Sequence, residues 1–165
     1  VTLFAKMMET NYLGLVYPLH FALPHLKSSK GTIVAVSSIQ GKIGVPKHTG
    51  YVASKHAVVG FLSALRQELD GSGVHILTVM PHWLRGTRLR ANAYAKDGSP
   101  VGEGRRGHSK ESISLEACSE AIVEAMISRK RELVVPWKLK LLPWLNLILP
   151  EIVDGLVGRE MGKQT

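Results

Sequence analysis

The sequence is poor in cysteine, aromatic residues and acidic residues. Its single thiol, Cys118, excludes a disulfide scaffold and argues against a zinc cluster built from several cysteines. Aromatic residues make up 6% of the chain, and no stretch of about 18 uncharged apolar residues predicts a membrane-spanning helix. The 13 acidic residues are outnumbered by 21 lysines and arginines, which gives a formal net charge of +8. This balance favours an anionic partner, such as a phosphate-bearing cofactor, an acidic membrane face or nucleic acid.

The arrangement of the polar residues excludes some of these possible partners. Basic residues are scattered and are not interleaved with aromatic side chains that could stack on bases, so we predict no nucleic-acid binding. The seven histidines have no HxxxH or HxH spacing, so we infer no metal site. A length of 165 residues fits one domain with a sizeable core. The chain begins with Val1 in a helix-like pattern, and we expect it to be the later part of a longer protein whose leader or anchor is not visible here.

Apolar periodicity predicts alternating helices and strands. The predicted helices span residues 3–26, 51–69 and 114–128, and the predicted strands span 32–36, 74–80 and 132–135. Pro18 is expected to kink the first helix, and Pro24 is expected to lie near its end. The alternation implies right-handed crossovers and an α/β fold, with three strands in a doubly wound, Rossmann-like parallel sheet covered by flanking helices.

The polar segment 82–112 is expected to be a long loop that is either a functional lid or a mobile segment. Within it, residues 102–107 match the phosphate-binding pattern GxGxxG, but no strand precedes them and no helix follows. We therefore interpret them as part of the lid. Arg105 and Arg106 could contact a phosphate or an acidic substrate when the lid closes, although a solvated basic loop is the simpler interpretation.

Three polar residues follow the first predicted strand at suggestive positions. Ser38 lies just beyond its end, and Tyr51 and Lys55 share one face of the next helix. An ammonium beside a phenol stabilises the phenolate and lowers the phenol's pKa from about 10. The Ser38 hydroxyl could hold a carbonyl oxygen beside that phenol. Such a set could move a proton to or from an alcohol oxygen, although a Tyr–Lys pair at this spacing is common in helices.

The joint pattern is more specific than the pair. Asn11, Ser38, Tyr51 and Lys55 follow one another at intervals of 27, 13 and 4 residues. In the segments 11–14, 36–38 and 51–55 the sequence resembles the short-chain dehydrogenase/reductase family, over about residues 1–135. The resemblance implies an NAD(P)-dependent oxidoreductase that interconverts a secondary alcohol and a ketone. It implies that Tyr51 is the general acid/base and that Lys55 lowers the pKa of Tyr51 and binds the nicotinamide ribose. It also implies that Ser38 orients the substrate oxygen and that Asn11 holds a water that relays protons.

The chain departs from the family pattern in two places. The family's cofactor turn, TGxxxGxG, and the strand that selects NAD or NADP do not occur here, so the resemblance covers only the C-terminal, catalytic half. NADP is favoured slightly, by the basic charge alone. The second departure follows strand 74–80. By resemblance Pro81 is a cofactor contact, His82 replaces a glycine and could line the substrate pocket, and Thr87 stands one residue later than the family's nicotinamide contact. The resemblance also implies a homodimer.

Residues 136–165 form an apolar extension beyond the catalytic part, 1–135. Its first part, 136–150, combines two tryptophans, two lysines and three prolines, which is typical of a segment at a membrane surface. A lid over an apolar pocket and a subunit contact are the alternatives. The extension resembles the family branch that handles steroids, retinoids and other lipids, which suggests a lipophilic substrate and a cytoplasmic or membrane-peripheral protein. A truncated non-catalytic remnant and a membrane-peripheral interaction module are the alternative functions.

Overall fold

The computed structural model describes residues 1–88, 91, 102 and 112–162. In chain order the helices and strands are α1 (Thr2–Met8), η1 (Glu9–Leu13), α2 (Gly14–Ser29), β1 (Thr32–Val36), η2 (Ile39–Gly41), α3 (Thr49–Glu68), β2 (His75–Pro81), α4 (Leu115–Ile127), β3 (Glu132–Val135), η3 (Trp137–Leu141), α5 (Leu142–Ile148) and α6 (Pro150–Gly162). The helices and strands predicted up to residue 135 are therefore present, with the ends of β1 and β3 as predicted and the other ends displaced by one to three residues.

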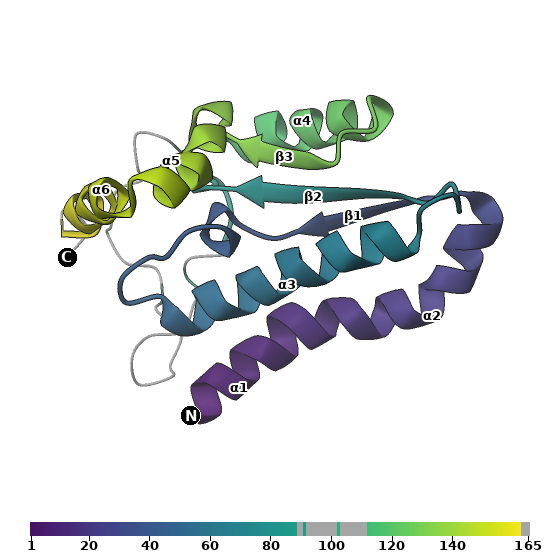
Figure 1. Ribbon diagram of the computed structural model, residues 1–165, viewed down its shortest axis with the longest axis horizontal. Helices are drawn as coiled ribbons and strands as arrows, with labels where there is room; N and C mark the ends of the chain where they lie inside the picture. The colour runs from purple at the N-terminus through teal and green to yellow at the C-terminus, as the bar shows by residue number, and fades with distance from the viewer. Residues whose placement is uncertain (89–90, 92–101, 103–111, 163–165) are drawn as a thin grey trace.

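The three strands form a parallel sheet in the order β1-β2-β3. Helix α3, backed by α1 and α2, covers one face of the sheet, and α4 covers the other (Figure 1). Alternate strand residues face opposite sides: Ile33 and Ile76 pack with Leu62 of α3, whereas Leu77 and Val79 pack with Ala125 of α4. The predicted doubly covered, Rossmann-like sheet is confirmed.

The first helix differs in detail from its prediction. It runs from Thr2 to Ser29 and passes through a five-residue π-helical segment, η1. The departure from α-helical hydrogen bonding thus lies around Asn11, upstream of Pro18, where a kink was predicted. Pro24 lies inside α2 rather than near its end, because the helix continues to a left-handed cap at Lys30.

The two ends of the segment that follows β2 pair with each other. Leu84 and Ile113 form a parallel bridge, in which Arg85 N–H donates to the Ile113 carbonyl at 2.8 Å and Ile113 N–H donates to the Trp83 carbonyl at 3.0 Å. The predicted loop 82–112 is therefore tied together near both ends. Most of the proposed lid, including Arg105 and Arg106, lies outside the described residues.

The C-terminal extension is helical, which the sequence analysis did not predict. Leu139 and Leu142 pack against a core cluster that includes Ile39 and Met80, and Val157 of α6 joins the same cluster. Helices η3, α5 and α6 are therefore docked on the body of the protein. No helix in the described ranges is long and apolar enough to cross a membrane.

Candidate active site

The candidate site lies at the carboxyl ends of β1 and β2, where parallel sheets bind their ligands. Ser38, which follows β1, is buried, and its hydroxyl lies 3.5 Å from the Pro81 carbonyl oxygen at the end of β2, to which it donates. The same hydroxyl oxygen accepts the Gln40 N–H at 3.2 Å and so caps η2. These contacts hold Ser38 between the two strand ends.

Helix α3 brings Tyr51 and Lys55 to Ser38. The Ser38 side chain lies near the Tyr51 phenol and acts to lower the phenol's pKa. The Lys55 Nζ atom lies 5.6 Å from the centroid of the Tyr51 ring and donates to the Val36 carbonyl oxygen at 3.3 Å. The structure therefore gathers the predicted serine, tyrosine and lysine at the end of β1.

Burial shifts the pKa values of both Tyr51 and Lys55. Burial raises the pKa of Tyr51, and the Ser38 side chain offsets only part of that rise. Burial also lowers the pKa of Lys55. The pKa of Tyr51 is raised because loss of hydration destabilises the phenolate more than Ser38 stabilises it. The role of Lys55 in lowering that pKa stays a prediction.

Asn11 reaches the site through another side chain. Its Nδ2–H donates to the Ser54 hydroxyl oxygen at 3.0 Å, and the Ser54 hydroxyl donates to the Tyr51 carbonyl at 2.8 Å. Asn11 lies in the π-helical segment, and such interruptions of α-helices often occur at functional sites. The structure therefore links Asn11 to the backbone of Tyr51 through Ser54.

Two positioning features escaped the sequence analysis. Ser54, between Tyr51 and Lys55, is fully buried, and its need for polar partners in a packed helix was the signal that could have identified it. Ser37 donates to the Lys55 carbonyl at 3.3 Å. A Cβ at Gly41 would lie 2.8 Å from that same carbonyl oxygen, so the absence of a side chain lets α3 approach η2 closely.

The remaining predicted residues are placed around the end of β2. Pro81 is the last residue of β2, and its carbonyl accepts the Ser38 hydroxyl. His82 donates its backbone N–H to Val135 at 2.8 Å, and its ring makes an edge contact with Trp83. Thr87 lies past the Leu84 bridge and is partly buried. Their roles toward cofactor or substrate stay predictions.

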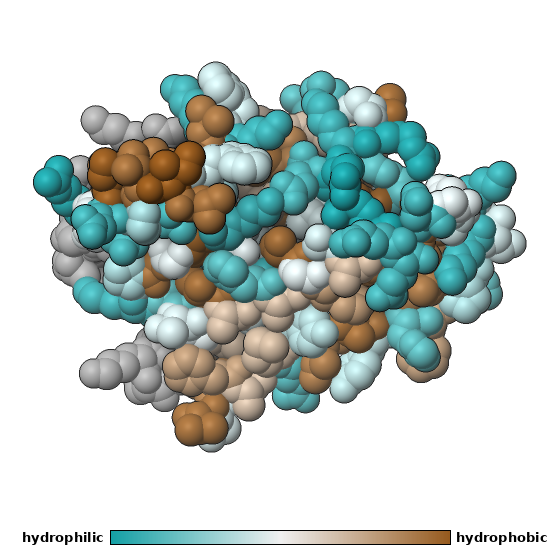
Figure 2. All heavy atoms as spheres, viewed as in Figure 1, coloured by the Kyte–Doolittle hydropathy of each residue, from teal (hydrophilic) through white to brown (hydrophobic). Residues whose placement is uncertain are grey.

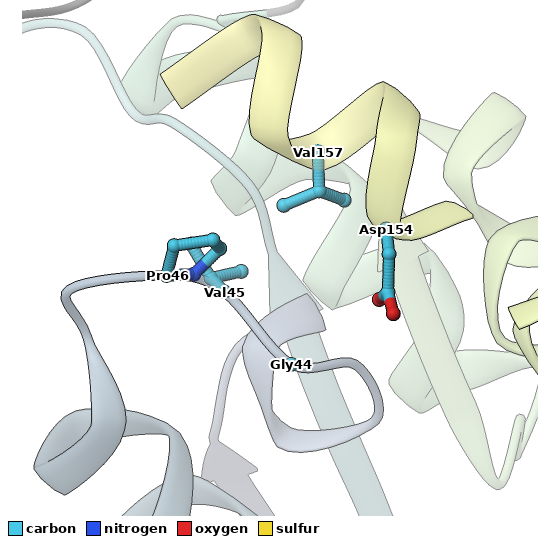
Figure 3. Close-up of a pocket in the computed structure, with 5 residues that line it drawn as sticks. All are labelled: Gly44, Val45, Pro46, Asp154 and Val157. Carbon is cyan, nitrogen blue, oxygen red and sulfur yellow. The ribbon is translucent and has the colours of Figure 1, made fainter. Parts of the chain in front are cut away.

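A cavity of about 400 Å³ lies beside α6 (Figure 3). It is lined by Gly44, Val45, Pro46, Asp154 and Val157. None of the predicted site residues lines this cavity. The lining residues 44–46 lie between Ser38 and Tyr51 in the sequence. In the described part of the chain, no group of three or more histidine, cysteine or acidic residues could hold a metal ion.

Comparisons with known proteins show the family of this chain. Residues 1–98 match the family model described as short chain dehydrogenase. The chain is 34% identical to "Dehydrogenase/reductase SDR family member 7B" of Danio rerio over 131 residues, which is 79% of this chain and 42% of that protein. It is 34% identical to "11-beta-hydroxysteroid dehydrogenase-like 4A" of Arabidopsis thaliana over 152 residues, 89% of this chain and 47% of that protein.

A solved structure shares the fold. It is a short chain dehydrogenase from Burkholderia cenocepacia in complex with NADP, with a TM-score of 0.69 and 20% identity, covering 91% of this chain and 56% of that one. The chain spans about half the length of the curated relatives it matches.

Proposed function

Because this chain belongs to the short-chain dehydrogenase/reductase family, we propose that it carries the catalytic residues of an NAD(P)-dependent oxidoreductase that interconverts a secondary alcohol and a ketone. The observation that supports the proposal is the meeting of three groups at the end of β1: the Ser38 hydroxyl, the Tyr51 phenol and the Lys55 ammonium. A proton donor, a group that can hold an oxygen and a cation are thereby placed together.

The donor set fits a nicotinamide dinucleotide. Lys55 carries three N–H donors, which suit ribose hydroxyls, and its described hydrogen bond uses one of them, toward Val36. Pro81 would lie beside the nicotinamide at the end of β2. When bound, the nicotinamide donates or accepts the hydride. The similar Burkholderia enzyme is described in complex with NADP, and the net charge of +8 slightly favours NADP here.

The chain's own residues would handle the proton and the oxygen. With its pKa raised by burial, Tyr51 is protonated at neutral pH, which is the state that a general acid needs to give a proton to a carbonyl oxygen during reduction. Ser38 would hold that oxygen beside the phenol. Asn11 would act through Ser54, which fixes the backbone of Tyr51.

We also propose a lipophilic substrate and a homodimer. Val45 and Val157 give the cavity beside α6 apolar walls, and one relative is named as hydroxysteroid dehydrogenase-like. His82 would line the substrate pocket near the end of β2, and Thr87 would contact the nicotinamide of the cofactor. The exposed Phe21 on α2 supports a second subunit packed there, as the family resemblance implies.

The test is an assay of the full-length protein that contains this sequence. It measures NADPH oxidation in the presence of each of a panel of steroidal and aliphatic ketones. Tyr51→Phe removes only the phenolic oxygen, so turnover should fall at least 100-fold, within the range of about 10²–10⁴ expected for a positioned acid, while NADPH affinity persists. Tyr17→Phe makes the same change on the exposed side of α2 and should leave turnover unchanged.

Two further variants separate the roles of the neighbours. Lys55→Met should lower both turnover and NADPH affinity, whereas Ser38→Ala should lower mainly turnover, by a hydrogen bond of about 1 kcal/mol or more. Retention of more than about a tenth of the wild-type turnover in Tyr51→Phe would require another general acid. His82 would be the next residue to test.

A further inference from the structure

The C-terminal helices expose large apolar side chains on the side away from the core. Between 65% and 75% of each side chain's surface is accessible at five positions: Trp137, Leu141, Trp144, Leu147 and Ile148. We call these five residues the arm patch. Figure 2 shows apolar residues gathered over α5 and the neighbouring part of α6.

The residues of the arm patch are not the ones that attach these helices to the body of the protein. Leu139 and Leu142, on the inner side, already pack against the core, and Val157 does the same for α6. A helix that is apolar on its solvent side as well as its core side is expected where a second apolar phase covers it. The outer face therefore requires a partner.

The charges around the arm patch indicate what kind of partner this is. No acidic residue occurs between Glu132 and Glu151, whereas Lys138 and Lys140 lie within the segment and are exposed. Lysine is depleted in the buried centres of protein interfaces. Lysine together with tryptophan beside aliphatic residues is the composition of segments that lie at the surface of a bilayer. Anionic lipid headgroups complement the two ammonium groups.

We propose that the arm patch, with Lys138 and Lys140, docks on an anionic lipid membrane. The tryptophans and leucines enter the headgroup region while the lysine side chains extend toward the phosphates. The chain lies on the membrane without crossing it through its described helices. This inference does not depend on the proposed enzymatic activity.

The experiment is flotation of the full chain with vesicles of phosphatidylcholine alone or with about a third phosphatidylserine. The anionic vesicles should bind the chain at least ten times more strongly. Leu147→Glu should reduce binding at least tenfold. Ile127→Glu is the matched control, because Ile127 is equally exposed, at the end of α4, and it should leave binding unchanged. Circular dichroism checks that both variants fold.

A second pair of variants tests the charges. Lys138→Glu and Lys27→Glu change the net charge equally, but only Lys138 lies beside the arm patch. We expect Lys138→Glu to weaken binding at least fivefold and Lys27→Glu to weaken it less than twofold, with the difference shrinking in high salt. Trp137 and Trp144 should show a blue-shifted emission on binding, which a variant with Trp83→Phe should retain.

Three results would overturn the proposal. Absence of binding to anionic vesicles at low salt is the first. Equal loss of binding in Leu147→Glu and Ile127→Glu is the second. The third is a chain that binds no vesicle but dimerises in size-exclusion chromatography until Leu147→Glu makes it monomeric, which would assign the arm patch to a second copy of the chain.

Discussion

The Tyr51 phenol is largely withdrawn from water, and the phenolate would lose its hydration there. The neighbouring Ser38 side chain favours ionisation, while the Lys55 ammonium lies over the ring and donates to the Val36 carbonyl. The balance raises the pKa of Tyr51. A protonated phenol at neutral pH suits proton donation to a carbonyl oxygen.

This balance predicts how the pKa of Tyr51 responds to Ser38→Ala. Removing the hydroxyl removes the one interaction that lowers the pKa, so Tyr51 should ionise at a still higher pH. Alkaline difference absorbance of the phenolate measures this, with Tyr51→Phe as the blank for the other tyrosines. An unchanged or lower midpoint in Ser38→Ala would contradict this effect of Ser38.

The raised pKa of Tyr51 also makes the free energy of unfolding depend on pH. The folded-state pKa of Tyr51 lies above its unfolded value near 10, so the folded chain binds more protons between the two values. The contribution of Tyr51 to the free energy of unfolding is therefore present below about pH 10. It is lost as the pH rises through the folded-state pKa.

Spacing along the chain located the residues of the site but not their contacts. The interval from Tyr51 to Lys55 placed both on one face of α3, as the structure has them. The partner of the Asn11 amide could not be predicted, because Ser54 lies 43 residues away in the sequence. Pairing of the half-buried Asn11 amide with the buried Ser54 hydroxyl depends on how α3 packs against η1, which no local pattern encodes.

At the scale of elements, the position of α3 controls the site. Ser37 and Gly41 hold the Lys55 turn of α3 against η2, through a hydrogen bond of 3.3 Å and a close backbone approach. Gly50 plays a similar part nearer the start of α3, where a Cβ would lie 2.9 Å from Met7 Sδ. Small residues at these two contacts fix the distance of α3 from its neighbours.

Gly41→Ala should therefore destabilise the chain by about 1–3 kcal/mol, because the added Cβ would meet the Lys55 carbonyl and the Ser37 hydroxyl. Gly60→Ala, on the exposed side of α3 with no atom near its Cβ, should instead stabilise it by about 0.5–1 kcal/mol. Urea unfolding measures both. Equal effects of the two substitutions would show that close packing at Gly41 does not position α3.

The elements that sequence predicted well have a simple periodicity. Strand β2 is mostly apolar and is buried along its whole length, and α3 repeats its buried residues at three- and four-residue steps. Helices α5 and α6 were missed because prolines interrupt the segment and α5 is apolar on all sides, so no amphipathic period marks it. The π-helical turn was missed because the apolar spacing of residues 3–26 predicts only a continuous helix.

At the scale of the whole molecule, β1 is an edge strand of the described sheet. It pairs with β2 on one side, and Val36 at its end is 56% exposed. An edge with free backbone groups and an exposed valine is prone to pair with another strand. The chain spans about half the length of the curated relatives it matches, and β1 is a strand of the described sheet at which further pairing can occur.

The chain alone should bind NADPH weakly, with a Kd of about 1 mM or higher. No strand-to-helix turn of the TGxxxGxG kind occurs in the sequence, so no helix N-terminus of that type receives the pyrophosphate. The contacts that remain, from Lys55 and Pro81, reach only the nicotinamide end by the family resemblance. Fluorescence titration of NADPH measures the affinity, and Lys55→Met should abolish whatever binding is seen. A micromolar Kd that survives Lys55→Met would place the phosphates on other residues of this chain. Millimolar binding that Lys55→Met removes would show that the catalytic end recognises the cofactor even here, which a non-catalytic remnant of the fold has no reason to retain.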